Sequence, residues 1–241
     1  MAVSNHLPCY DPAFVKQLFD EMAATYGVMN LVSSFGFARR WRRQCIRAVP
    51  IRPGDRVLDL MTGMGEILPD AGRMIGSDGS ITAIDISSRM CQEARRRASD
   101  RVPCPVQIIE ADVLSIDLPP GSADVVLSSF GLKTLSSDQI RTLARRVHDI
   151  LAPGGRLSFV EISVPRSYWL RVPYMFYLRR VIPVLGALFL GNPDNYRLLG
   201  VYTGAFGDCS DACRAFAEAG LEVEPVSYFF GCATGVIGRK S

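Results

Sequence analysis

Histidine is nearly absent from this chain, which has only two among its 241 residues. With so few imidazoles, far apart in the sequence, a histidine-based metal site or a serine–histidine nucleophile pair has little to be built from. The seven cysteines are an odd number without Cys-x-x-Cys spacing, and the nearest two, Cys209 and Cys213, stand one helical turn apart. Reduced and mostly buried thiols are therefore expected, and no metal site is predicted.

Concentrated charge and long apolar runs are missing too. The formal net charge is only +3, and the densest basic stretch, ARRWRRQCIR at 38–47, is expected to be a solvated helix face. Nucleic acid is therefore not predicted as a partner, although contact of this stretch with an acidic membrane surface or protein stays open. The longest uncharged apolar run within 166–206 has 11 residues, at 181–191, too short to span a bilayer. The first 14 residues lack the pattern of a secretory signal, so a cytoplasmic location is predicted.

What the chain does contain is a regular alternation of helix-like and strand-like segments. Apolar residues recur at helical spacing over 12–26 and 36–49, ahead of a compact apolar strand at 56–60. Further strands alternate with helices from there on, and they are predicted at 81–85, 106–111, 123–130 and 155–163. Repeated βα units of this length predict a doubly wound, parallel α/β sheet of the Rossmann-like kind.

Two glycines one residue apart follow the first predicted strand, in VLDLMTGMGE at 57–66. Gly63 and Gly65 allow a tight turn and a close approach of a ligand to the backbone. Asp59, late in the strand, can fix the loop or receive a ligand ammonium. A dinucleotide fingerprint needs a further glycine at position 68, which is leucine, and no Gly-Lys-Ser or Gly-Lys-Thr follows. Both a dinucleotide site and a P-loop are thereby excluded.

Two carboxylates narrow the choice of ligand. Asp85 ends the second strand 20 residues after Gly65, where it can accept both hydroxyls of a ribose. Asp112 follows the third strand, where it can meet an adenine amino group. Together they favour S-adenosylmethionine, a nucleoside without phosphates. The alternative is that these acids only form turns or cap helices.

Five stretches resemble, in order, the blocks of the ubiquinone/menaquinone biosynthesis C-methyltransferases, the UbiE family. They are FDEMAATYGVMNLVSSFGFARRWRR (19–43), VLDLMTGMGE (57–66), SSFGLKTLSS (128–137), LAPGGRLSFVEISVP (151–165) and NPDNYRLLG (192–200). The glycine loop and APGGRL occur in many class I methyltransferases, whereas the first and last blocks are much more specific. The resemblance implies a class I fold that binds S-adenosylmethionine and methylates a carbon of an aromatic, usually prenylated, small molecule.

By position, the resemblance assigns the cofactor contacts to the N-terminal block, the glycine loop and the ends of the second, third and fourth strands. These residues are Tyr26, Met29, Asp59, Thr62, Gly63, Gly65, Asp85, Ile86, Met90, Ala111, Asp112, Val113, and Ser128 or Ser129. A packing role is the alternative for each of them.

The chain also departs from the family pattern. Gly27 stands where the family commonly has an aspartate after the tyrosine, and YTGAFG at 202–207 replaces a segment that carries an arginine. The last strand, in ATGVIGRKS, lacks a histidine often found there. Because a positive charge near the acceptor is lost, we expect a relative recruited to an aromatic or prenylated metabolite other than a respiratory quinol.

The chemistry needs a proton acceptor, because a phenol-type carbon becomes nucleophilic only when its hydroxyl is deprotonated. The preferred assignment gives this role to Glu161, or a water it holds, with Arg197 stabilising the phenolate and Tyr196 beside it. A salt bridge of Glu161 to an arginine, and mutual packing of Tyr196 and Arg197, are the alternatives. Lys133 can orient an acceptor oxygen or bond a backbone carbonyl.

Four regions follow from these assignments. We expect an N-terminal helical cap at 1–50, the cofactor-binding core at 51–165, a helical acceptor lid at 166–206 and a C-terminal helix with strands at 207–241 that complete the sheet. The aromatic-rich lid is expected to be a pair of helices packed on the core, with an acceptor tunnel or a patch on a membrane surface as further readings. Pairing as a homodimer is left open. An O- or N-methyltransferase and a non-methylating cyclase are the alternative functions.

Overall fold

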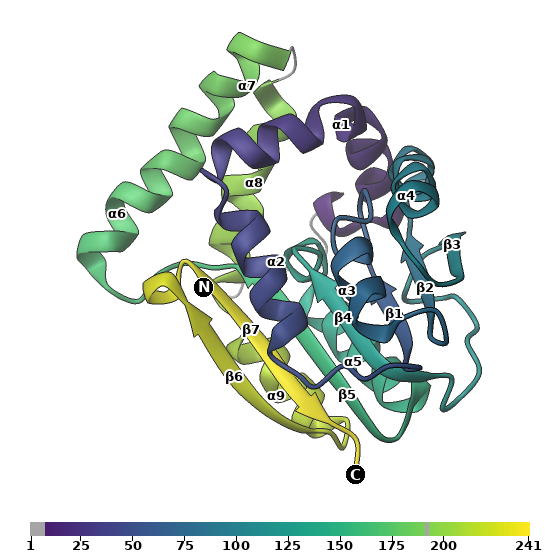
Figure 1. Cartoon of the computed structure of the whole chain (residues 1–241). Coiled ribbons are helices and arrows are strands. Elements are labelled where there is room, and N and C mark those ends of the chain that lie inside the picture. The colour runs from purple at the N-terminus through teal and green to yellow at the C-terminus, as the bar shows by residue number, and fades with distance from the viewer. Residues whose placement is uncertain (1–7, 191–192) are drawn as a thin grey trace.

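Seven strands form one sheet in the order β3-β2-β1-β4-β5-β7-β6 (Figure 1). The computed structural model describes residues 8–190 and 193–241. The strands are β1 (Arg56–Leu60), β2 (Ser80–Asp85), β3 (Val106–Glu110), β4 (Ala123–Ser129), β5 (Leu151–Ile162), β6 (Glu222–Tyr228) and β7 (Ala233–Arg239). The first five run parallel, and β7 pairs antiparallel with both β5 and β6. The predicted doubly wound α/β sheet is confirmed, with an antiparallel hairpin at one edge.

Helices cover both faces of this sheet and the edge where the parallel strands end. They are α1 (Pro12–Ser33), α2 (Phe37–Arg47), α3 (Leu68–Ile75), α4 (Ser88–Arg101), α5 (Ser137–Ile150), α6 (Tyr168–Phe176), α7 (Ile182–Leu190), α8 (Pro193–Phe206) and α9 (Ser210–Glu218). A π-helical segment, Tyr177–Val181, joins α6 to α7. The region expected to hold a pair of helices therefore contains three, α6 to α8.

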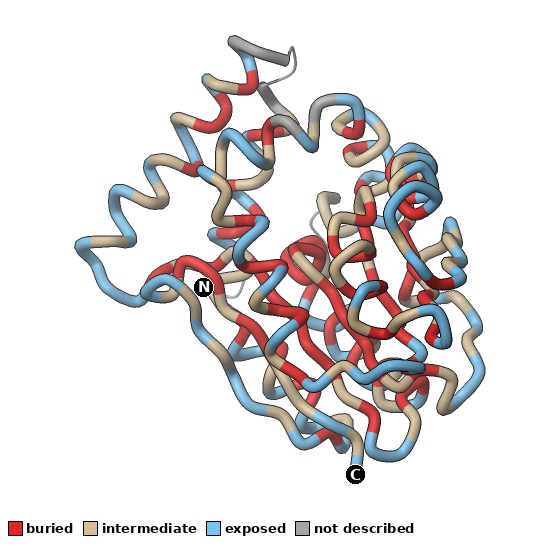
Figure 2. The backbone as a smooth tube through the Cα atoms, viewed as in Figure 1, coloured by how far each residue is buried: buried red, intermediate tan, exposed pale blue. Residues whose placement is uncertain are grey.

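Figure 2 shows that buried residues are concentrated in the strands of the sheet. Successive residues of a strand point to opposite faces, so they divide the core between the two sides of the sheet. Val57 and Val125 pack with α3 and α4, whereas their neighbours Leu58 and Val126 pack with α5 and α9. Since strands buried on both faces need apolar residues at nearly every position, the short continuous runs in the sequence are explained.

Side chains at the helix starts account for several boundaries. Ser87 caps α4 by accepting a hydrogen bond from Met90 N. Ser136 and Gln139 form a reciprocal capping box at the start of α5. All seven cysteines are free, and five of them are buried, as predicted: Cys45, Cys91, Cys104, Cys209 and Cys232.

The basic stretch at 38–47 forms α2 and is only in part the solvated face that its charge predicts. Arg39, Arg40 and Arg43 are exposed, but Arg42 is only 9% exposed and lies with Trp41 on the buried side of the helix. No helix in the described part of the chain combines the length and hydropathy that crossing a membrane requires.

Candidate active site

The glycine loop after β1 is shaped by backbone conformations that only glycine adopts easily. Gly63 and Gly65 have φ angles of +58° and +71°. The amide of Gly63 donates a 2.8 Å hydrogen bond to Asp85 Oδ2, which ties the loop to the end of β2. A Cβ at Gly65 would lie 2.7 Å from Leu68 Cδ1 and 3.2 Å from the Ala94 Cα. Gly65 therefore allows α3 and α4 to pack closely, and does not itself line the cofactor cavity.

Asp85 is held at the end of β2 with its carboxylate toward this loop. It is 7% exposed and accepts hydrogen bonds from the amides of Gly63 and Ser87, the latter at 2.9 Å. Burial raises the pKa of Asp85 to about 6, and these two hydrogen bonds oppose the shift. The position fits the predicted ribose acceptor, because one edge of the group still faces the cavity.

A cavity of about 770 Å³ lies at the carboxyl ends of β1, β2, β3 and β4. The structure brings ten of the predicted cofactor residues together in its wall: Tyr26, Thr62, Gly63, Asp85, Ile86, Met90, Ala111, Asp112, Val113 and Ser129. They come from α1, from the first turn of α4 and from the ends of four separate strands. This edge is where parallel α/β sheets bind their ligands, beside the point where the strand order reverses between β1 and β4.

Besides Gly65, three of the predicted cofactor residues do not line this cavity. Met29 lines a neighbouring cavity instead. Ser128 is 1% exposed and donates a 2.7 Å hydrogen bond to the carbonyl of Leu60, because alternate residues of β4 point to opposite faces. Of the two serines left open, only Ser129 reaches the cavity. Asp59 lies beneath the loop, where Thr62 Oγ1 donates to its Oδ2 at 2.5 Å.

The charge state of Asp59 follows from its burial. It is 1% exposed, and burial raises its pKa to about 8, opposed by the hydrogen bond from Thr62. Its Oδ1 atom is buried without a hydrogen-bond partner among the described residues. Of its two predicted roles, the first, fixing the loop, agrees with this geometry.

Arg42 of α2 also lines the cavity, although sequence reasoning assigned it to a solvated face. Its Nη2 atom lies 3.0 Å from Glu66 Oε1, and its guanidinium carbon is 5.0 Å from the centre of the Phe130 ring. Its Nε–H is buried and has no hydrogen-bond partner within the described part of the chain. Five arginines fall within the nine residues from Arg39 to Arg47, so the sequence does not indicate which of them is buried.

These residues fit S-adenosylmethionine on two independent grounds. Asp85 offers a carboxylate for ribose hydroxyls, and the apolar side chains of Ile86, Met90 and Val113 can pack on the adenine. At the other end of the cavity, the unpartnered Arg42 Nε–H and the neighbouring Glu66 carboxylate match an amino-acid carboxylate and ammonium. A buried donor that the protein leaves unsatisfied is costly unless a ligand completes it.

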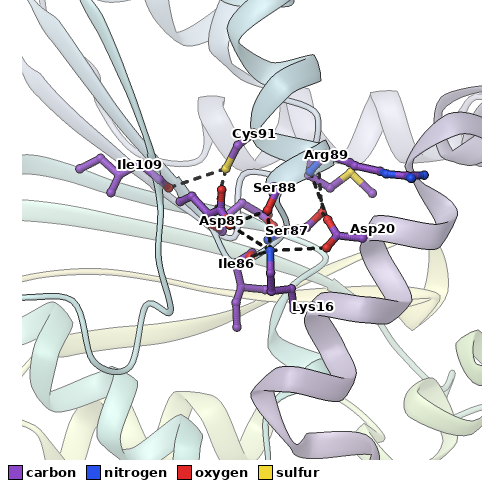
Figure 3. Close-up of polar contacts among 11 residues, drawn as sticks. Lys16, Asp20, Asp85, Ile86, Ser87, Ser88, Arg89, Cys91 and Ile109 are labelled. Atoms are coloured by element: carbon purple, nitrogen blue, oxygen red, sulfur yellow. Dashed lines mark hydrogen bonds and ion pairs between the residues drawn. The ribbon is translucent and has the colours of Figure 1, made fainter.

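Polar contacts join α1 to the segment that follows β2 (Figure 3). Lys16 Nζ lies 2.6 Å from Ser88 Oγ and 2.9 Å from Glu110 Oε1. One turn later, Asp20 accepts hydrogen bonds from Ser87 Oγ at 2.7 Å and from the amide of Arg89 at 3.1 Å. The N-terminal helix is therefore fixed directly to the segment that carries Asp85.

A second cavity, of about 1270 Å³, adjoins the first. Phe19, Tyr26, Phe130 and Thr134 line both. The second cavity is enclosed by α1, α2, α8 and the α6–α7 segment, and its walls are mainly aromatic and aliphatic. Lys133 is the only charged side chain that lines it among the residues the structure describes. The fold therefore joins a nucleoside-sized cavity to an apolar one with one cation at its wall.

Lys133 is held by Glu161 and by its own loop. Its Nζ lies 3.0 Å from Glu161 Oε1 and also donates to the carbonyl of Phe130 at 2.5 Å. Glu161 is fully buried, and it accepts from the amides of Lys133 at 3.0 Å and Ile162 at 2.7 Å. Its carboxylate does not line either of the two cavities. Glu161 therefore forms a buried salt bridge, as its alternative role predicted, but the partner is Lys133 and not an arginine.

The other two predicted catalytic residues, Tyr196 and Arg197 of the NYR motif on α8, point in different directions from that helix. Tyr196 is 6% exposed and lines the apolar cavity. Arg197 is exposed and lines neither cavity, because consecutive helix positions point about 100° apart. Arg197 therefore does not lie at either cavity. The charged side chain at the wall of the apolar cavity is Lys133.

Cofactor affinity should depend on pH through Asp85. Ribose hydroxyls donate to a carboxylate, so binding favours the charged form, and protonation opposes it. Since the pKa of Asp85 is about 6 in the free protein, we expect the affinity for S-adenosylhomocysteine to be constant just above this pH. It should fall by up to ~10-fold for each pH unit below it. Calorimetric titrations across this range check the prediction, and an Asp85→Asn variant should bind weakly without this step. A step that persists in the variant would assign the titration to another group.

Comparisons with known proteins agree with this geometry. The model of the ubiE/COQ5 methyltransferase family matches residues 9–240. The ubiquinone/menaquinone biosynthesis C-methyltransferase UbiE of Shewanella frigidimarina is 30% identical over 209 residues, covering 86% of this chain and 82% of that protein. The enzyme of the same name from Serratia proteamaculans is 35% identical over 188 residues, covering 78% and 74%.

Solved structures share the fold at lower identity. An S-adenosylmethionine-dependent methyltransferase from Aquifex aeolicus superposes with a TM-score of 0.59 at 18% identity, covering 96% of this chain and 99% of the other. Magnesium protoporphyrin IX methyltransferase from Synechocystis, with bound S-adenosylhomocysteine, gives 0.59 at 15% identity, covering 95% and 99%. The sheet, the cavity at its carboxyl edge and the sequence match lead to one conclusion. The chain belongs to the ubiE/COQ5 methyltransferase family and is an S-adenosylmethionine-dependent methyltransferase.

Proposed function

We propose that this enzyme methylates a ring carbon of a phenol- or quinol-type small molecule that carries an apolar, prenyl-like chain. The observation that carries the proposal is the junction of the two cavities. The larger cavity can enclose an extended apolar chain, and the side chains shared with the cofactor cavity place the reacting end of such a molecule beside the cofactor.

The proposal extends to the kind of molecule that accepts the methyl group. The curated relatives are named for ubiquinone and menaquinone biosynthesis, yet Gly27 and Gly204 replace residues that the family pattern leads us to expect. A Cβ at Gly204 would lie 2.7 Å from Arg179 Nη2, so a larger side chain would displace that arginine. We infer that the chain is a relative recruited to a secondary metabolite with the same aromatic and apolar parts.

The protein's contribution to the reaction is alignment, exclusion of water and control of one proton. When bound, S-adenosylmethionine supplies an electrophilic methyl group, so a nucleophile held in line needs little further activation. Lys133 faces the apolar cavity and can hold the acceptor oxygen as an oxyanion, which raises the electron density of the adjacent ring carbon. In the dry cavity this electrostatic interaction is stronger than in water.

Glu161 acts through Lys133 in this proposal. The carboxylate fixes the ammonium by an ion pair and through the backbone of the same residue. A proton that leaves the acceptor hydroxyl can be relayed by the Lys133 ammonium, which gives one proton to Glu161 as it receives another. Glu161 thus remains the proton acceptor in this proposal, but it receives the proton through Lys133 and does not contact the methyl-accepting molecule itself.

The alternatives concern the atom that receives the methyl group. An O- or N-methyltransferase fits the same scaffold. The fold is also shared by SpnF, described as a 4+2 cyclase, which superposes with a TM-score of 0.58 at 17% identity, covering 83% of this chain and 80% of the other. A product one methyl heavier than the acceptor excludes the cyclase. Carbon connectivity by NMR then separates C-methylation from methylation at oxygen or nitrogen. A homodimer and a cytoplasmic location stay predictions.

A further inference from the structure

Helix α6 carries apolar side chains on two opposite sides. Tyr168, Trp169, Val172 and Phe176 fall within a 100° arc of the helix, and they are exposed by 62%, 86%, 50% and 62%. On the other side of the same helix, Leu170 and Tyr174 pack against the core. A surface helix of a soluble protein normally turns polar residues toward water, so the exposed arc is a face that something else covers.

Two neighbouring segments extend this face. The turn between β6 and β7 carries Phe229 and Phe230, which are 47% and 81% exposed, and the end of α1 carries Phe35, which is 78% exposed. The turn lies against the start of α6, since a Cβ at Gly231 would be 3.6 Å from the Pro165 Cα (Figure 1). Phe35 stacks on Tyr177, just after α6, with ring centres 5.9 Å apart.

We call the whole set the aromatic rim. Its members are Phe35, Tyr168, Trp169, Val172, Phe176, Phe229 and Phe230.

Two members of the aromatic rim lie at an entrance to the apolar cavity. Phe35 and Phe229 are exposed and also line that cavity, so they stand where it meets the surface. Tyr174 and Tyr177 line it from the α6 side. A molecule that enters here passes from the exposed aromatic surface directly into the apolar interior.

The chain segment that contains α6 carries charge of one sign only. Residues 163–191 contain four arginines and no aspartate, glutamate or lysine. All four, Arg166, Arg171, Arg179 and Arg180, are exposed. Arg166 lies 3.5 Å from Asp208, and the Arg171 guanidinium lies 5.7 Å from the centre of the Tyr168 ring. Two copies of the chain joined through this face would bring the same positive charges together, which disfavours self-association.

We propose that the aromatic rim docks the enzyme on an anionic lipid bilayer, from which an apolar acceptor enters the cavity. Tryptophan, tyrosine and phenylalanine mixed with arginine form the side-chain set that binds at the boundary between headgroups and acyl chains. The arginines add attraction to anionic headgroups. Docking itself is independent of the reaction, whereas the entry of the acceptor rests on the proposed function.

Trp169 provides a direct readout. The chain has two tryptophans, and Trp41 is only 5% exposed, so a change in the environment of Trp169 dominates a difference in fluorescence. We expect a blue shift when vesicles of phosphatidylcholine and phosphatidylglycerol are added, and quenching when the lipid carries bromine on its acyl chains. Binding to vesicles of pure phosphatidylcholine should be weaker by a factor of ~10 or more. No shift with either vesicle would overturn the proposal.

Variants test whether vesicle binding depends on the aromatic rim or on nonspecific hydrophobic contact. Trp169→Phe combined with Phe176→Ser and Phe230→Ser should lower vesicle partitioning ~10-fold or more in a flotation assay. Phe14→Ser, at an exposed apolar position on α1 outside the rim, is the matched control and should change nothing. Equal loss in both variants, or a wild-type protein that sediments as a dimer and binds no vesicles, would contradict docking.

The two proposals can fail separately. If the enzyme methylates a detergent-dispersed acceptor but binds no vesicles, docking is wrong and the proposed function stands. If it binds vesicles through the aromatic rim but methylates no aromatic acceptor, the proposed function is wrong and docking stands.

Discussion

Replacing Lys133 by methionine is expected to lower kcat about 100- to 1000-fold while leaving the affinity for S-adenosylhomocysteine within about twofold. The reason is that Lys133 is the one charged side chain, among the described residues, that lines the apolar cavity, whereas it is not part of the cofactor cavity wall. Single-turnover rates with a saturating phenolic acceptor, and calorimetry for the cofactor product, measure the two effects separately.

The single variant leaves the fully buried Glu161 without its ion-pair partner, which costs about 3–5 kcal/mol of folding stability. The double variant Lys133→Met with Glu161→Gln removes both charges and should fold, with the same loss of kcat. Lys133→Arg, which keeps a cation at this position, should recover most of the rate. A double variant with wild-type kcat would show that the pair only stabilises the loop.

Replacing Arg42 by glutamine should weaken binding of S-adenosylhomocysteine by about 10- to 100-fold, the value of one or two hydrogen bonds to a charged group. Methylthioadenosine has the same nucleoside and thioether but no amino-acid carboxylate, and its affinity should change by less than about twofold. The contrast arises because the buried Arg42 Nε–H is unpartnered among the described residues and lines the cofactor cavity. Calorimetry with the two ligands provides the measurement.

Arg40→Gln is the matched control, since Arg40 is exposed on the same helix and lines neither cavity. It should leave both affinities unchanged. Because Arg42 also pairs with Glu66, its loss could loosen the loop as a whole. In that case both ligands would weaken to the same extent, and that result would assign Arg42 a structural role.

The parts of the site that follow from strand connectivity could be predicted from the sequence. In a parallel sheet, the residue that ends each strand must lie at the carboxyl edge, so Asp85, Asp112 and the glycine loop were placed without any knowledge of packing. The wall of the cofactor cavity confirms that Asp85 and Asp112 meet there. Alternation along β4 was needed to choose between Ser128 and Ser129, and the exact register of that strand was not predictable.

Features that depend on how helices pack could not be predicted in this way. Arg42 lies among several arginines, and the choice of which one is buried depends on the contact of α2 with the sheet and the loop after β4. Glu161 and Lys133 are 28 residues apart, and only the fold brings their charged atoms within 3.0 Å. An aromatic residue in α6 can be exposed or packed on the core, and its residue type does not indicate which. Only the structure shows that Trp169 is exposed while Tyr174 packs against the core.

The central claim is that the enzyme transfers a methyl group to a ring carbon of an aromatic acceptor with an apolar chain. The most direct test is to incubate the purified protein with S-adenosylmethionine labelled at its methyl group and a lipid extract of its own host, and then to identify the labelled compound by mass spectrometry and NMR. The account predicts the label on a ring carbon of a prenylated or otherwise apolar aromatic compound. Label only on oxygen or nitrogen, or on a polar compound without an apolar chain, would contradict it.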